Sequence, residues 1–326
     1  MDAPDRRGKH AGPGTRSLRA CARGYAVIET FLQTLPHGIT LSCRAAGERG
    51  RPVLMFLHGF PQAAFVWDDL LRHFSQPAHG GYRCIAPNLR GYEQSSAPSD
   101  VQAYRAKHLV QDIAALMDAE THGAPVAALV AHDWGGAVAW NLANQQPQRL
   151  QRLAIINSPH PGTFLRELRT NPRQQAASAY MNFLVRPDAE ALLAADDYRR
   201  LWSFFEGERG AAWLTEAVKD RYRALWRGGA GLVGGCHYYR ASPLRPPSAD
   251  DPAAAAIDLP DAMLTVDRPT LVLWAMDDVA LLPELVDGLQ AWVPDLTLER
   301  IPGASHWVLH EQPEQVRDRL ARFFAA

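Results

Sequence analysis

Short apolar runs alternate with amphipathic stretches along most of the chain, and this alternation limits the possible folds more than any other feature. An apolar run such as 53–57 suits a strand that is buried on both faces. Apolar side chains at helical spacing, such as Trp67, Leu70 and Phe74, indicate an amphipathic helix between two such runs. The sequence therefore predicts an α/β fold with a mostly parallel eight-stranded sheet flanked by helices. The predicted strands cover residues 31–35, 39–44, 53–57, 82–86, 126–131, 153–157, 270–275 and 296–301.

The alternation stops between residues 161 and 263, where helical periodicity and aromatic side chains replace the strands. This pattern predicts a helical cap at 161–263, inserted into an α/β core that consists of residues 25–160 and 264–326. The Pro- and Ala-rich residues 242–261 are expected to return the chain to the core. Core helices are expected near residues 65–74, 109–117, 136–144, 283–292 and 313–324.

The composition excludes several classes of protein. The chain has 326 residues, and its 34 Lys and Arg against 35 Asp and Glu give a net charge of −1. This balance argues against a nucleic-acid-binding protein, because such proteins usually carry an excess of basic residues. Its apolar runs are far shorter than the ~20 residues of a membrane span, which excludes an integral membrane protein. The four cysteines lack the spacing of a zinc site or redox pair. We expect a cytoplasmic protein in which residues 1–24 form a disordered extension.

Residues 131–136, with the sequence Ala-His-Asp-Trp-Gly-Gly, follow a predicted strand and precede a predicted helix. Small residues at 131, 135 and 136 permit a very sharp turn, because strand and helix approach closely there. Such a turn presents its central residue, Asp133, at the carboxyl end of the sheet, beside a helix N-terminus that favours an anion. An Asp at this position can instead simply cap the helix. Partners elsewhere in the chain favour a catalytic carboxylate.

A carboxylate with a reference pKa of about 3.9 is ionised at neutral pH and needs no base to attack a saturated carbon. The attack leaves an alkyl ester, which water must then hydrolyse. His306, between the last strand and the last helix, is the candidate base, and Asp277 or Asp278 can orient it. Spacing alone does not separate these two aspartates. The backbone amides of Phe60 and Trp134 are the candidates for an oxyanion hole.

Four motifs make nearly all of residues 25–326 resemble the α/β-hydrolase fold family and, within it, the soluble epoxide hydrolases. They are His-Gly-Phe-Pro at 58–61, Asn-Leu-Arg-Gly-Tyr at 88–92, His-Asp-Trp-Gly-Gly at 132–136 and His-Trp at 306–307.

This resemblance implies a role for each candidate residue. Asp133 would be the nucleophile, His306 the base, and Asp278 rather than Asp277 the acid. Two tyrosines of the cap hold the epoxide oxygen in such enzymes, and the matching positions are Tyr180 and Tyr239. The implied reaction opens a small apolar epoxide to a vicinal diol. The sequence contains no metal-ligand cluster, phosphate-binding glycine loop or flavin motif, so no cofactor is expected.

Two other functions remain open. Haloalkane and haloacetate dehalogenases resemble the chain in the same Asp-His-Asp machinery but bind a departing halide. Trp134 suits a halide donor, whereas Phe60 stands where one group of dehalogenases has Asn, and fluoroacetate dehalogenases have Arg in place of Trp134. The other alternative is a non-catalytic binding protein on the same fold, while Asp133 excludes a serine esterase. The oligomeric state stays open, a homodimer included.

Other conspicuous side chains have more ordinary interpretations. His58, His132 and His160 are expected to be hydrogen-bonded structural residues rather than catalysts. The glycines between residues 228 and 235 are expected to form a flexible loop of the cap, because no predicted strand precedes them. Aromatic residues of the cap suggest either the wall of an apolar pocket or the core of the cap itself. These residues are Trp202, Phe204, Phe205 and Trp213.

Overall fold

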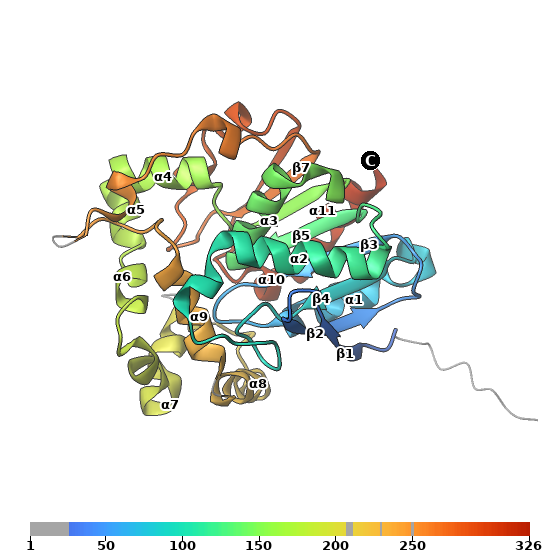
Figure 1. The fold of residues 1–326 in the computed structure, drawn as a ribbon, viewed down its shortest axis with the longest axis horizontal. Helices are drawn as coiled ribbons and strands as arrows, with labels where there is room; N and C mark the ends of the chain where they lie inside the picture. The colour runs from blue at the N-terminus through green and yellow to red at the C-terminus, as the bar shows by residue number, and fades with distance from the viewer. Residues whose placement is uncertain (1–25, 207–210, 229, 249–250) are drawn as a thin grey trace, which may run out of the picture.

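A mixed sheet forms the centre of the computed structural model, which describes residues 26–206, 211–228, 230–248 and 251–326 (Figure 1). Within these ranges the sheet has eight strands in the order β1-β2-β4-β3-β5-β6-β7-β8. The β1–β2 and β2–β4 pairs are antiparallel and the other pairs are parallel, which confirms the predicted fold class. The strands are β1 (Glu29–Thr34), β2 (Thr40–Ala46), β3 (Val53–Leu57), β4 (Arg83–Pro87), β5 (Ala128–His132), β6 (Leu153–Ile156), β7 (Thr270–Ala275) and β8 (Leu296–Ile301). The extension predicted at 1–24 lies outside the described residues.

Helices cover both faces of the sheet, because the side chains of its central strands alternate between two apolar layers. In β3, Met55 and Leu57 pack in the layer that includes α2 and α3, whereas Leu54 and Phe56 pack in the layer that includes α1 and α11. All five residues of β3 are buried. The helices of the core are α1 (Asp68–Phe74), α2 (Ala106–Thr121), α3 (Trp134–Gln145), α10 (Val308–Glu311) and α11 (Pro313–Ala325).

The strand order explains where a site can form. β3 pairs with β4 on one side and with β5 on the other, so the order of the strands reverses at β3. Parallel sheets open a crevice beyond the carboxyl ends of the strands at such a reversal. The loops that follow β3 and β5 therefore lie side by side at one edge of the sheet.

Six α-helices lie between β6 and β7 in the described part of the chain, where the sequence predicts a helical cap. Figure 1 shows α5 to α9 to one side of the sheet, away from α11. The inserted helices are α4 (Pro161–Thr170), α5 (Pro172–Ala177), α6 (Tyr180–Leu184), α7 (Ala189–Glu206), α8 (Glu216–Arg227) and α9 (Ala230–Ala241). None of the helices in the described ranges combines the length and the apolar character that a membrane crossing requires.

Two local predictions are wrong. The helix expected at 283–292 is two short 3-10 helices, because Asp287 is extended and Gly288 has φ +74°. The glycines expected in a cap loop belong largely to α9, and Gly234 lets this helix approach the loop after β4, since a Cβ atom there would lie 2.5 Å from the Gly91 Cα atom. The 3-10 helices are η1 (Ala64–Trp67), η2 (Pro77–His79), η3 (Val101–Tyr104), η4 (Pro147–Arg149), η5 (Ala253–Ala256), η6 (Asp261–Met263), η7 (Pro283–Val286) and η8 (Leu289–Ala291).

The aromatic residues of the inserted helices mostly form packing contacts. The Trp202 ring lies 4.7 Å from the Trp226 ring, and the Phe205 ring lies 4.3 Å from the Trp307 ring of the core, between ring centroids. The indole of Trp307 also donates a hydrogen bond of 2.8 Å to the Phe204 carbonyl oxygen. Of the two interpretations offered by the sequence, the structure supports packing within the inserted helices and against the core.

Candidate active site

Asp133 occupies a sharp turn between β5 and α3. Its backbone has φ +50° and ψ −123°, a conformation that residues other than Gly rarely adopt. Gly135 permits the turn, because a Cβ atom there would lie 2.4 Å from the Leu57 carbonyl oxygen of β3. Asp133 stands at the N-cap position of α3 without making the side-chain hydrogen bond of a capping residue. The turn instead presents the carboxylate at the carboxyl end of the sheet.

Two backbone amides contact the Asp133 carboxylate. The amide of Phe60, in the loop after β3, donates to Oδ1 at 2.8 Å, and the amide of Trp134 also donates to the carboxylate. Burial raises the pKa of Asp133, while the charge of His306 and the two amide hydrogen bonds oppose this increase. The structure thus brings together the two amides that the sequence suggests for an oxyanion hole.

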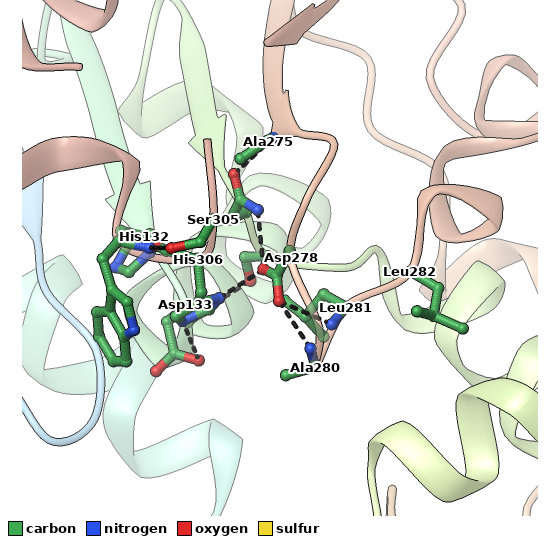
Figure 2. A network of polar contacts seen from close by, with 12 residues as sticks. His132, Asp133, Ala275, Asp278, Ala280, Leu281, Leu282, Ser305 and His306 are labelled. Carbon is green, nitrogen blue, oxygen red and sulfur yellow. Dashed lines mark hydrogen bonds and ion pairs between the residues drawn. The ribbon is translucent and has the colours of Figure 1, made fainter. Parts of the chain in front are cut away.

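His306 lies between two carboxylates (Figure 2). Its Nδ1 atom is 2.7 Å from Oδ2 of Asp278, and its Nε2 atom is 3.6 Å from Oδ2 of Asp133. Burial alone lowers the pKa of His306, but the charge of Asp278 and its hydrogen bond, together with the charge of Asp133, raise this pKa to about 9. The three side chains come from the loops after β5, β7 and β8, which end at the same edge of the sheet.

The structure distinguishes the two adjacent aspartates by their surroundings. The Asp278 side chain is fully buried, and its Oδ1 atom accepts hydrogen bonds from the amides of Ala280 and Leu281 at 2.9 and 3.0 Å. Its Oδ2 atom accepts from His306 and from the Asn157 side chain, the latter at 2.9 Å. It is therefore the Asp278 carboxylate, rather than that of Asp277, that holds the imidazole.

Asn157 is a member of this network that the sequence did not indicate. Its side-chain oxygen accepts a hydrogen bond of 2.9 Å from the Ala275 amide, and its amide group donates to Asp278. Asn157 thereby links the ends of β6 and β7, with a backbone φ of +40°. A polar residue directly after a buried strand at the site edge of the sheet is the signal that could have identified it.

Glu311 is a second missed residue. Its carboxylate accepts hydrogen bonds from the amide and the hydroxyl of Ser305, both at 2.7 Å, and so constrains the residue directly before His306. The His306 carbonyl oxygen lies 3.0 Å from Nε2 of His132. Contacts with Glu311 and His132 therefore fix the backbone of the loop at Ser305 and at His306.

The histidines expected to be structural make hydrogen bonds inside the protein. Nε2 of His58 accepts from the Leu89 amide at 3.0 Å, and Nε2 of His160 lies 2.8 Å from the Leu264 carbonyl oxygen. Burial lowers the pKa of each of these two histidines to about 4, so both are neutral at pH 7. Their side-chain hydrogen bonds go to backbone atoms and not to the Asp133 carboxylate.

Tyr180 and Tyr239 face the same cavity as Asp133, from α6 and α9. Their ring centroids are 6.0 Å apart, and the Tyr239 ring lies edge-on to Trp134 at 5.0 Å and to Phe60 at 5.4 Å. Burial raises the pKa of both phenols, and the negative charge of Asp133 adds to this increase. The two hydroxyls therefore stay protonated and can donate hydrogen bonds at neutral pH.

The cavity has a volume of about 310 Å³ and a mainly apolar wall. The inserted helices contribute Phe164 and Met181 to it besides Tyr180, Tyr238 and Tyr239. Among the described residues that line it, Asp133 is the one carboxylic acid, and Lys, Arg and His are absent. Such a cavity suits a small uncharged molecule that meets one carboxylate and two phenols.

Comparison with known proteins agrees with this arrangement. The family model for the alpha/beta hydrolase fold matches residues 52–313. The AB hydrolase superfamily protein YfhM of Bacillus subtilis is 33% identical over 290 residues, which cover 88% of this chain and 95% of that protein. Human epoxide hydrolase 4 is 31% identical over 301 residues, which cover 90% of this chain and 78% of that protein.

A solved structure extends the agreement to three dimensions. It is described as one of the novel epoxide hydrolases of the alpha/beta hydrolases superfamily from metagenomes of hot environments. It superimposes with a TM-score of 0.80 at 36% identity, covering 91% of this chain and 98% of that one. On the evidence of the sheet order, the turn at Asp133 and these matches, the chain belongs to the α/β-hydrolase fold family and is similar within it to the epoxide hydrolases.

Proposed function

We propose that this protein is an epoxide hydrolase that converts an apolar epoxide to a vicinal diol through a covalent ester on Asp133. The observation that carries the proposal is the presence of Tyr180 and Tyr239 in one cavity with Asp133. An epoxide oxygen stays attached to the substrate and becomes an alkoxide, so its donors must also supply a proton. Protonated phenols do both, whereas a departing halide needs donors but no proton.

In the first step, the free carboxylate oxygen of Asp133 attacks an epoxide carbon. The Phe60 amide holds Oδ1, so Oδ2 is the attacking atom. The carbon–oxygen bond of the epoxide breaks, its electron pair stays on the epoxide oxygen, and Tyr180 or Tyr239 donates a proton to that oxygen. The product is an alkyl ester of Asp133 that carries a hydroxyl on the neighbouring carbon.

In the second step, His306 removes a proton from a water molecule, and the resulting hydroxide attacks Cγ of the Asp133 ester. The amides of Phe60 and Trp134 stabilise the charge that develops on Oδ1. Asp278 stabilises the imidazolium through the hydrogen bond of 2.7 Å to Nδ1. The ester bond between Cγ and Oδ2 then breaks, and His306 returns a proton to the departing alkoxide, so that the diol leaves. The new carboxylic acid of Asp133 releases its proton and the phenolate takes one up, which restores both groups.

Paired substrates test this proposal against the dehalogenase alternative. Purified protein is supplied with styrene oxide and, separately, with chloro- and bromoalkanes and fluoroacetate, and diol formation and halide release are measured. We expect diol formation that the Asp133→Ala variant abolishes, and little halide release. Fast halide release with no diol would show that the chain is a dehalogenase. No turnover of any substrate, with binding demonstrated, would favour the non-catalytic binding protein.

A further inference from the structure

The cavity extends well beyond the catalytic side chains, along one face of α3. Trp134, Ala137, Val138 and Asn141 all line it, and their spacing of three, four and seven residues places them on one side of the helix. At a rise of 1.5 Å per residue, the seven residues from Trp134 to Asn141 span about 10 Å. The apolar space is therefore elongated, with Asp133 near one end of this helix face.

The far wall of this elongated space comes from the segment that returns the chain from the inserted helices to the core. Ile257, Leu259 and Met263 of this segment line the cavity. The Asn144 side chain donates hydrogen bonds to the carbonyl oxygens of Ala262 and Thr265 at 3.0 and 2.8 Å, which fixes the segment beside the last turn of α3. Met263 is 55% exposed, so the far end of the cavity reaches the protein surface.

The wall of the cavity along α3 offers no compensation for a charged ligand. Asn141 and Ser242 are polar, but the described residues of this wall include no Lys, Arg or His. Burial of a carboxylate without a cationic partner is costly, and the Asp133 carboxylate would add repulsion. An uncharged apolar chain instead gains free energy with each methylene that it buries.

On the basis of the proposed epoxide hydrolase function, we infer that the α3 face binds the tail of the substrate. The substrate class is an epoxide with a long, uncharged alkyl or aryl-alkyl substituent. Its epoxide lies at Asp133 beneath the two tyrosines, its tail lies along Ala137 and Val138, and the tail end meets Asn141 and Met263 near the surface. The length of this substituent, rather than the epoxide itself, then sets the selectivity of the enzyme.

A homologous series of 1,2-epoxyalkanes tests this inference. We expect kcat/KM to rise about two- to fourfold for each added methylene and to level off once the tail reaches Met263. A value of kcat/KM that does not depend on tail length would overturn the inference while leaving the proposed function intact. Absence of turnover throughout the series, including the short epoxides, would instead contradict the proposed function.

A charge exchange sharpens the test. Two substrates are compared: an epoxide whose tail ends in a carboxylate, and the methyl ester of the same compound. The tail of both is shorter than the length at which kcat/KM stops rising in the alkane series. The wild-type protein should favour the ester by at least about tenfold in kcat/KM. Asn141→Arg places a cation at the tail end and should shift this ratio toward the carboxylate by about tenfold or more.

Gln145→Arg is the matched control, because Gln145 is exposed one turn further along α3 and does not line the cavity. It adds the same charge and should leave the ester-to-carboxylate ratio at the wild-type value. Equal ratios for the two arginine variants would overturn the assignment of the tail site. A wild-type protein that accepts the carboxylate as readily as the ester would do so as well.

Discussion

The core side and the inserted side of the cavity hold their functional groups in different ways. On the core side, Asp278 accepts hydrogen bonds from Asn157, from two backbone amides and from His306. On the inserted side, Tyr180 and Tyr239 rely more on ring packing, at centroid distances of 5.0 to 6.2 Å, with one hydrogen bond between them and one between Tyr239 and the Trp134 side chain. Hydrogen bonds fix both distance and direction, whereas ring packing permits a broader range of positions.

This difference has a consequence for catalysis. In the proposed mechanism, Asp133, His306 and Asp278 have different tasks, so the loss of any one of them should block a chemical step. The two tyrosines share one proposed task, the stabilisation of the epoxide oxygen, so loss of one should weaken epoxide opening without abolishing it. We therefore expect replacement of a catalytic residue on the core side to have a larger effect than replacement of either tyrosine.

The largest effect is expected for His306. Replacement by Gln should slow hydrolysis of the ester by about 10⁴-fold or more, since no other described side chain contacts both Asp133 and Asp278 in the same way. Alkylation should continue, so mass spectrometry of the intact protein after substrate addition should show one added substrate mass. Digestion of the protein should then place this mass on the peptide that contains Asp133. The Asp133→Ala variant should gain no mass. An adduct on another peptide would contradict the mechanism.

The pair of adjacent aspartates provides the next test. Asp278→Asn should slow ester hydrolysis by about 10²- to 10⁴-fold, because a neutral partner cannot stabilise the imidazolium. Asp277→Asn should have a far smaller effect, because the hydrogen bond to His306 comes from Asp278. Single-turnover kinetics of the two variants measure both rates. The reverse order would transfer the acid role to Asp277.

Epoxide opening should slow partly when one tyrosine is replaced and almost completely when both are. Tyr180→Phe or Tyr239→Phe should each slow epoxide opening by about 10- to 10³-fold, since a hydrogen bond to a developing oxyanion contributes roughly 2.7–4 kcal/mol in the best-studied case. The double Phe variant should be nearly inactive in alkylation. Tyr198→Phe, which changes a buried tyrosine of α7 outside the cavity wall, is the control. An undiminished double variant would contradict epoxide chemistry.

The two steps should respond differently to pH. His306 acts as a base only when neutral, and its pKa is raised to about 9 in the free protein. Esterification removes the Asp133 charge, one of the causes of that increase, so the pKa falls below about 9 in the intermediate. Hydrolysis should therefore rise about tenfold per pH unit below this pKa and level off above it, as stopped-flow measurements between pH 5 and 9.5 can show. A hydrolysis rate that falls as pH rises would contradict the role of His306.

Glu311 should show the smallest of these effects. Glu311→Gln weakens the hold on Ser305 and removes a negative charge that helps to raise the pKa of His306. We expect hydrolysis to slow by about tenfold and its pH midpoint to move to lower pH. Glu314→Gln, at an exposed position in α11, is the matched control. A rate loss without a shift of the midpoint would indicate a purely structural role for Glu311.

Much of the core side could be predicted from the sequence, because its signals are local. Apolar runs marked the strands, and the small residues around Asp133 marked a turn that the backbone of this residue does adopt. Asp133, the pair Asp277 and Asp278, and His306 each follow a predicted strand, and a parallel sheet brings the ends of these strands to one edge. These patterns depend on periodicity and on backbone sterics, and both are determined by residues that are close together in the sequence.

Other features depend on contacts between distant parts of the chain, and only the tertiary structure decided them. Asn157 and Asp278 are 121 positions apart, and no spacing rule joins them. The same holds for the aromatic residues of the inserted helices, whose periodicity fits a pocket wall and a packed core equally well. The tail site along α3 arises only where residues 257–263 meet that helix. Local patterns specify which face of an element is apolar, whereas packing alone decides what that face meets.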